Sequence, residues 1–176
     1  GETSRKENAR EVLNALSDFA GEFVVATAGP DLESVLAAKG AGAVDYSRRS
    51  GKTVLHMDIG GGTANLALIR DGKITATGCV NVGGRLVKLD NSGRLLYISP
   101  VLEGLWPHVP GETVEEASLE NLAQTLNQAL EMAAGLLQRT ALLDQLTTAG
   151  TAALPLAAPE EGMVISFSGG VADCIA

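Results

Sequence analysis

Apolar residues recur along the chain with two spacings, one typical of helices and one typical of strands. Helical spacing occurs in residues 4–20 and 119–137, and a shorter helix is expected at 32–39, before Gly40. Continuous apolar runs that fit buried strands occur at 23–28, 54–59, 64–69, 74–79 and 163–167. This succession predicts an α/β domain in which helices flank a sheet.

Turn residues indicate how several of these strands pair. Arg70-Asp-Gly-Lys73 is a strong signal for a two-residue turn, so the runs on either side of it should form an antiparallel hairpin. Residues 85–98 are expected to form a second hairpin around Asn91-Ser-Gly93. The sheet is therefore predicted to be mixed, with antiparallel hairpins. The remaining connections are expected to be irregular at 41–51 and 147–162, with a helix extended or restarted at 142–146.

Three consecutive glycines separate the first hairpin's opening strand from the strand before it, in Asp58-Ile-Gly-Gly-Gly-Thr63. A P-loop or a dinucleotide fingerprint would open a helix at this point, and here a strand follows. Glycine permits positive φ or the close approach of another group, and successive N–H groups in such a turn form a concave anion site. A glycine-rich turn without a ligand is the alternative.

The residues around the triplet predict a phosphate site with a metal ion beside it. The main-chain amides of Gly60, Gly61, Gly62 and Thr63 are expected to face phosphates, with the Asn65 amide at the rim. Asp58 ends the preceding strand and supplies a carboxylate that can hold Mg²⁺ through one of its waters. The segment from Ser47 to Lys52 is basic and could also face a phosphate, but a solvated connection is favoured.

Composition excludes several other classes of function. The net charge of −8 disfavours nucleic acid and anionic membranes as partners, and no apolar run reaches the length of about 18 residues that a membrane span needs. The two cysteines lack metal-binding spacing, so oxygen-bound Mg²⁺ is expected rather than zinc, and reduced thiols fit a cytosolic protein. His56 is expected to be a satisfied sheet residue, and Trp106 an anchor beneath a loop.

Three glycine motifs, taken in order, resemble those of the actin, sugar-kinase and heat-shock chaperone ATPase superfamily. Asp58–Thr63 is similar to its second phosphate loop, Asn81-Val-Gly-Gly-Arg85 to its later Gly-Gly, and Ser166–Ala172 to its adenosine loop. The resemblance implies a ribonuclease H-like, actin-type subdomain that binds ATP and Mg²⁺. It adds to the predicted site Gly83, Gly84, Ser168, Gly169 and Gly170. The last three also fit an ordinary strand-to-helix turn, and Arg85 fits a surface ion pair better than a phosphate contact.

More narrowly, the chain from about Phe23 onward resembles the reactivating factors of ethanolamine ammonia-lyase, through Asp58–Asn65, Asn81–Leu86 and Ser168–Asp173. This implies an ATP-dependent chaperone that promotes release of damaged cobalamin from that lyase, in the cytoplasm or with a bacterial microcompartment. Residues 1–176 would be one subdomain, the second nucleotide-binding half of a longer protein. Whether ATP is hydrolysed stays open, and a fragment alone is expected to be inactive. A small-molecule kinase or phosphohydrolase, or a scaffolding relative without turnover, are the alternatives.

Overall fold

The computed structural model describes residues 30–156 and 158–171. The helix predicted at 4–20 and the strand predicted at 23–28 lie outside these residues. The helices are α2 (Pro30–Gly40), α3 (Ala43–Ser50), the 3₁₀ helix η2 (Pro100–Leu102), α4 (Glu116–Ala133) and α5 (Ala141–Leu146). The strands are β1 (Val54–Ile59), β2 (Ala64–Arg70), β3 (Lys73–Val80), β4 (Val87–Leu89), β5 (Leu95–Ile98) and β6 (Val164–Ser168).

The main sheet has the strand order β3-β2-β1-β6, and β4 pairs with β5 in a separate hairpin. β2 is antiparallel to both β1 and β3, whereas β6 is parallel to β1. The predicted turn closes the β2–β3 hairpin, with Asp71 and Gly72 both at positive φ, the two-residue turn geometry that matches the right-handed twist of the flanking strands. The predicted α/β class, with a mixed sheet, antiparallel hairpins and flanking helices, is confirmed.

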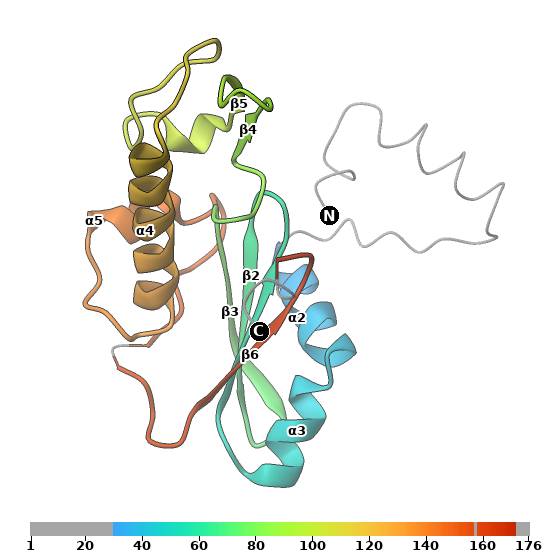
Figure 1. Cartoon of the computed structure of the whole chain (residues 1–176). Coiled ribbons are helices and arrows are strands. Elements are labelled where there is room, and N and C mark those ends of the chain that lie inside the picture. The colour runs from blue at the N-terminus through green and yellow to red at the C-terminus, as the bar shows by residue number, and fades with distance from the viewer. Residues whose placement is uncertain (1–29, 157, 172–176) are drawn as a thin grey trace, which may run out of the picture.

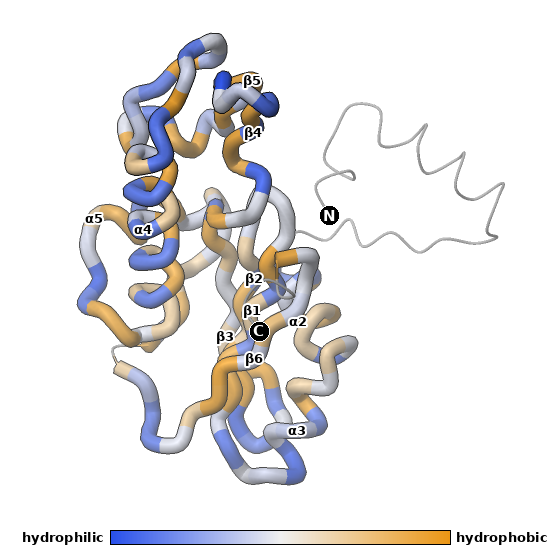
Figure 2. The backbone as a smooth tube through the Cα atoms, viewed as in Figure 1, coloured by the Kyte–Doolittle hydropathy of each residue, from blue (hydrophilic) through white to orange (hydrophobic). Residues whose placement is uncertain are grey.

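Helices cover both faces of the main sheet (Figure 1). Leu55, Met57 and Ile59 point from β1 toward α4 and α5 and pack in the largest apolar cluster with residues of those helices. The alternate positions of the sheet face α2 and α3, where Val54 and Ile69 join a smaller cluster. Figure 2 shows the hydrophobic residues concentrated along these central strands.

The β4–β5 hairpin, η2 and the beginning of α4 enclose a satellite core. Trp106 is only 6% exposed there, which confirms its predicted role as an anchor beneath the loop after η2. Its indole Nε1 donates to Ser118 Oγ at 3.0 Å, so the loop is fixed to the first turn of α4. Among the residues in this structure, no helix is both long and apolar enough to cross a lipid bilayer.

Two expectations about helices were wrong. Residues 43–50 form α3 instead of an irregular segment, because Gly42 and Gly51 adopt left-handed conformations at its two ends and its buried side packs on the sheet. Arg48 pairs with Asp45 at 2.9 Å. Its side chain lies beside Gly72 in the β2–β3 turn, at the end of β2 opposite the predicted phosphate loop. The helix predicted to reach residue 137 ends at Ala133, because Gly135 at positive φ turns the chain although the apolar residues continue.

Candidate nucleotide-binding site

Three glycine loops, far apart in the sequence, meet through main-chain hydrogen bonds. The Gly84 amide donates to the Gly60 carbonyl at 3.0 Å, and the Arg85 amide donates to the Gly61 carbonyl at 2.7 Å. The Val171 amide donates to the Ile59 carbonyl at 3.2 Å. The structure therefore brings together the three segments that the sequence motifs assigned to one site.

The loop between β1 and β2 leaves the amides of Gly61 and Gly62 for a ligand. The Gly60 amide donates to the Thr63 carbonyl at 2.9 Å, so Gly60 closes the turn. The described part of the chain supplies no acceptor for the N–H groups of Gly61 or Gly62, and both residues are only half-buried. Main-chain N–H groups in folded proteins are nearly always paired, with protein, water or ligand. Two adjacent, accessible donors are what an anion site requires.

Close approach explains the need for glycine at two of the predicted positions. A Cβ on Gly83 would lie 2.6 Å from the carbonyl carbon and oxygen of Gly61. A Cβ on Gly169, which has φ of +89°, would lie 2.4 Å from the Ile59 carbonyl oxygen. By contrast, the glycines of the triplet have no positive φ, and a Cβ on Gly60 would meet nothing nearer than 3.6 Å. Gly83 and Gly169 therefore hold the three loops together, whereas Gly61 and Gly62 present amides.

Asp58 lies at the end of β1, where both neighbouring strands place polar residues beside it. The register pairs Asp58 with Asn65 of β2 and with Ser168 of β6. Ser168 Oγ donates to Asp58 Oδ1 at 2.6 Å, a charge-assisted bond between residues 110 positions apart. This contact joins the predicted metal-side residue to the predicted nucleoside-side loop.

Asn65 does not lie at the rim, as the sequence suggested, but is buried beneath α2 and only 6% exposed. It faces inward because it shares a sheet face with Asp58, and α2 covers that face. Its Nδ2 lies 3.4 Å from Glu33 Oε2, whereas its Oδ1 is buried with no hydrogen-bond partner. An unpaired buried carbonyl oxygen costs free energy, so a bound water or metal-bound water would be stabilising here.

His56 and Glu33 belong to this neighbourhood although the sequence did not place them there. His56 is fully buried, with Nδ1 2.9 Å from Ser166 Oγ and Nε2 3.0 Å from Ser168 Oγ. Burial lowers the pKa of His56, and the charge of Asp58 opposes that shift. The prediction of a satisfied sheet residue is confirmed, but its link to the site was missed. The two-residue spacing of His56 and Asp58, which places both on one face, was the available signal.

Arg85 lies over the glycine loop. Its Nε would be 3.2 Å from a Cβ on Gly61, and its side chain is exposed. Within residues 30–156 and 158–171 it forms no ion pair, so the predicted surface ion pair is not found there. A guanidinium beside the free amides of Gly61 and Gly62 adds positive charge where phosphate is predicted.

No ready-made protein cage for a metal ion is found in the part of the chain that can be described. No group of three or more His, Cys, Asp or Glu side chains is close enough to hold one there. Ser168 already occupies Asp58 Oδ1. Mg²⁺ commonly binds through one or two carboxylates, several waters and the phosphates of a ligand, and a single carboxylate such as Asp58 suits that mode.

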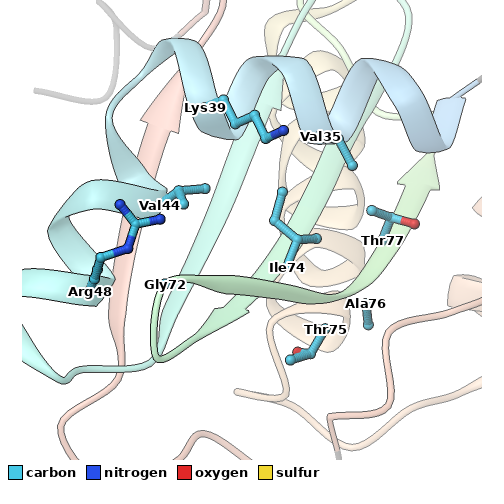
Figure 3. A pocket seen from close by; sticks show the side chains of 9 residues that line it. All are labelled: Val35, Lys39, Val44, Arg48, Gly72, Ile74, Thr75, Ala76 and Thr77. Atoms are coloured by element: carbon cyan, nitrogen blue, oxygen red, sulfur yellow. The ribbon is translucent and has the colours of Figure 1, made fainter.

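A separate hollow lies away from the three glycine loops. A groove of about 500 Å³ runs between α2, α3 and β3. Figure 3 shows Lys39 of α2 and Arg48 of α3 along one side of it, and Ile74 and Thr77 of β3 along the other. None of the residues predicted for the nucleotide site lines it. The candidate site is therefore a surface made by three loops, separate from this groove.

Comparison with known proteins gives close relatives over the whole chain. Residues 1–176 match the family described as "Ethanolamine utilisation protein EutA". The chain is 41% identical over 178 residues to ethanolamine ammonia-lyase reactivase EutA of Escherichia coli K12. It is 37% identical over 187 residues to the protein of that name from Salmonella typhimurium LT2. Each alignment covers 99% of this chain but only 37% of the relative, so the chain spans little more than a third of their length.

Solved structures resemble the chain less closely. A Ppx/GppA family member from Aquifex aeolicus superimposes with a TM-score of 0.42 at 19% identity, covering 78% of this chain and 37% of that one. MreB5 of Spiroplasma citri bound to AMPPNP gives a TM-score of 0.28 at 22% identity, covering 77% and 33%.

Proposed function

The chain belongs to the EutA family of ethanolamine utilisation proteins, and from this premise we propose that it is a nucleotide-binding half of an ATP-dependent chaperone that reactivates ethanolamine ammonia-lyase. The relatives that carry the name reactivase are longer, so the activity is proposed for the full-length protein. One observation carries the nucleotide part of the proposal: three glycine loops meet around the accessible, unpaired amides of Gly61 and Gly62.

We assign the phosphates of ATP to the β1–β2 loop. The N–H groups of Gly61 and Gly62, with the Thr63 hydroxyl, would hold phosphate oxygens, and Arg85 would approach from above. Each hydrogen bond to a charged oxygen contributes about 1.5–3 kcal/mol net, so two or three suffice to anchor the phosphate chain. Gly83 and Gly84 would brace this loop from behind. Ser168, Gly169 and Gly170 would lie on the nucleoside side, where both glycines are exposed.

The polar residues beside the loop fit a hydrated Mg²⁺. Asp58 would accept a hydrogen bond from a metal-bound water, and the unpaired Asn65 Oδ1 would accept another. Bound Mg²⁺ would supply positive charge that offsets the phosphates in a chain whose own net charge is −8. Asp58 and Asn65 would thus orient the metal's waters without contacting the metal directly.

Reactivation would follow from a change of shape. Because main-chain bonds tie the β1–β2 loop to segments 83–85 and 168–171, occupancy of the amides would bias all three together. In the full-length protein this bias would loosen the lyase around its damaged cobalamin, so that the spent cofactor leaves. The partner is therefore the lyase, and we expect the protein in the cytoplasm, free or with a microcompartment.

The test is restoration of lyase activity by the full-length protein. Lyase inactivated on damaged cobalamin is mixed with the protein, ATP, Mg²⁺ and intact adenosylcobalamin, and turnover of ethanolamine is measured. We expect recovery that requires ATP and is lost in the Asp58→Ala variant, which should keep its fold. Full recovery without ATP would contradict the nucleotide part of the proposal, and no recovery at all would contradict the chaperone role. Phosphorylation of a small metabolite without the lyase would favour a kinase.

A further inference from the structure

His56 lies where an apolar residue would be expected, in the centre of the sheet. It belongs to β1, between two strands, and is 0% exposed. A buried imidazole is tolerated only if both ring nitrogens have partners, and Ser166 and Ser168 of β6 supply them at 2.9 and 3.0 Å. Two serines at alternate positions of one strand thus face one histidine on the next.

The direction of each hydrogen bond follows from the carboxylate at the end of the series. An ionised Asp58 can only accept, so Ser168 must donate its single proton to Asp58 Oδ1. The Ser168 oxygen can then only accept from His56, which places the ring proton on Nε2. Nδ1 is left without a proton and accepts from the Ser166 hydroxyl. One tautomer of a neutral imidazole satisfies all three bonds.

This series joins two parts of the site. Ser168 immediately precedes Gly169, whose backbone lies against Ile59, and Asp58 immediately precedes Ile59. We propose that His56 is a positioning residue which, through Ser168, fixes the Asp58 carboxylate and couples the nucleoside-side loop to the Mg²⁺ side of the phosphate loop. The proposal rests on the proposed function, because it concerns the response of that same site to Mg²⁺. His56 itself touches neither nucleotide nor metal.

The proposal predicts that loss of the His56–Ser168 contact changes ATP affinity in the presence of Mg²⁺ but not in its absence. Groups that hydrogen-bond to metal ligands typically matter by roughly 10–100-fold in metal affinity when they are removed. Asp58 would be such a group, and Ser168 and His56 lie one contact further out, so loss of the His56–Ser168 contact should weaken the Mg²⁺-dependent gain in ATP affinity by the lower part of that range, about tenfold. In His56→Asn, ATP affinity in the presence of a chelator should stay the same, because His56 touches neither nucleotide nor metal and the amides of Gly61 and Gly62 are not altered.

The experiment measures ATP binding to the full-length protein by calorimetry, with MgCl₂ and with EDTA. Ser168→Ala removes the link, and His56→Asn removes the donor that reaches Ser168 while keeping a polar side chain. His56→Gln is the matched variant, because a glutamine amide can take the place of the Nε2–H donor. Ser166→Ala is the control on the other side of the ring. Thermal unfolding of each variant shows whether it is folded.

We expect Ser168→Ala and His56→Asn to lose the Mg²⁺-dependent gain, and His56→Gln and Ser166→Ala to retain most of it. An unchanged gain in Ser168→Ala, with wild-type protein responding to Mg²⁺, would overturn the inference and leave the proposed function standing. A wild-type protein whose ATP binding ignores Mg²⁺ would instead contradict the proposed function. Ser168→Ala keeps His56 intact, so the test holds even if the histidine variants fail to fold. Nitrogen NMR of His56 should show the Nε2–H tautomer, and the Nδ1–H tautomer would also overturn the inference.

Discussion

The glycines of this site have different physical roles. Gly83 and Gly169 are required because another backbone lies where a Cβ would be. Gly61 and Gly62 matter for what their amides can bind, and Gly60 for closing the turn. The motif letters alone could not separate these tasks, because the contacts come from segments more than 20 positions away. Replacement by alanine distinguishes them.

We predict that Gly83→Ala and Gly169→Ala each destabilise the protein by about 1–3 kcal/mol, since main chain must move to admit the new methyl group. Gly60→Ala and Gly170→Ala are matched controls and should change the free energy of unfolding by less than about 0.5 kcal/mol, because a Cβ finds room at both positions. Urea unfolding of the four variants measures the difference. Equal losses in both pairs would refute the close approach of the three loops.

A second prediction at the residue scale concerns how Glu160 makes the stability of the protein depend on pH. Hydrogen bonds from Arg70, first, and from Thr53 hold the pKa of Glu160 below its ordinary value of 4.5. A carboxyl whose pKa is lowered on folding adds stability above its unfolded pKa and loses it as pH falls through the folded one. Urea midpoints should therefore fall more steeply in wild type than in Glu160→Gln as pH drops below 4.5. The variant should also be less stable at neutral pH, and parallel pH profiles would contradict this.

At the level of elements, local signals sufficed for the strands within the described residues, but they failed for α3 and for the end of α4. The β2–β3 hairpin was predictable because Asp71-Gly72 fixes the turn and apolar runs flank it. α3 was not, because its sequence has few apolar residues and two bordering glycines. The helix forms since Ala43 and Ser47 are buried against the sheet, which only the folded chain reveals. The end of α4 was predicted wrongly for the opposite reason, because apolar residues at helical spacing continue beyond the last residue of the helix.

The satellite core yields a prediction at this scale. Trp106→Ala should destabilise the protein by about 3–5 kcal/mol, because a large buried side chain is removed and the loop loses its bond to Ser118. Leu96→Ala, on the neighbouring hairpin but 50% exposed, is the control and should cost under about 1 kcal/mol. Chemical unfolding measures both. A small effect of Trp106→Ala would mean that the β4–β5 region contributes little to global stability.

At the scale of the whole molecule, the order of the three motifs predicted which residues belong to one site, and their mutual contacts did not follow from it. Asp58 and Ser168 are 110 positions apart, and no local pattern announces the bond between them. Glu33 was missed because an acidic residue in the first turn of a helix is common. Two details of the predicted site differ in the structure: the Gly60 amide is paired with the Thr63 carbonyl, and Asn65, expected at the rim, is buried.

The chain spans 37% of its reactivase relatives, and this leads to a prediction about affinity. We expect the isolated 176-residue chain to bind ATP more weakly than the full-length protein. If ATP binds in a cleft between two subdomains, this chain would supply only one side of that cleft. Calorimetry on both proteins, with Mg²⁺ present, measures the difference. A dissociation constant for the chain alone below about 1 µM would contradict the split cleft.

The alternation of β1 has a consequence for sequence change. His56 and Asp58 lie on one face of this strand, and Leu55, Met57 and Ile59 lie on the other, apolar face. Deleting a single residue between Val54 and Asp58 would move every following side chain of the strand to the opposite face of the sheet. The Asp58 carboxylate would then be buried in the apolar layer under α4. A deletion within β1 should therefore disturb the fold far more than a substitution of any one of its residues.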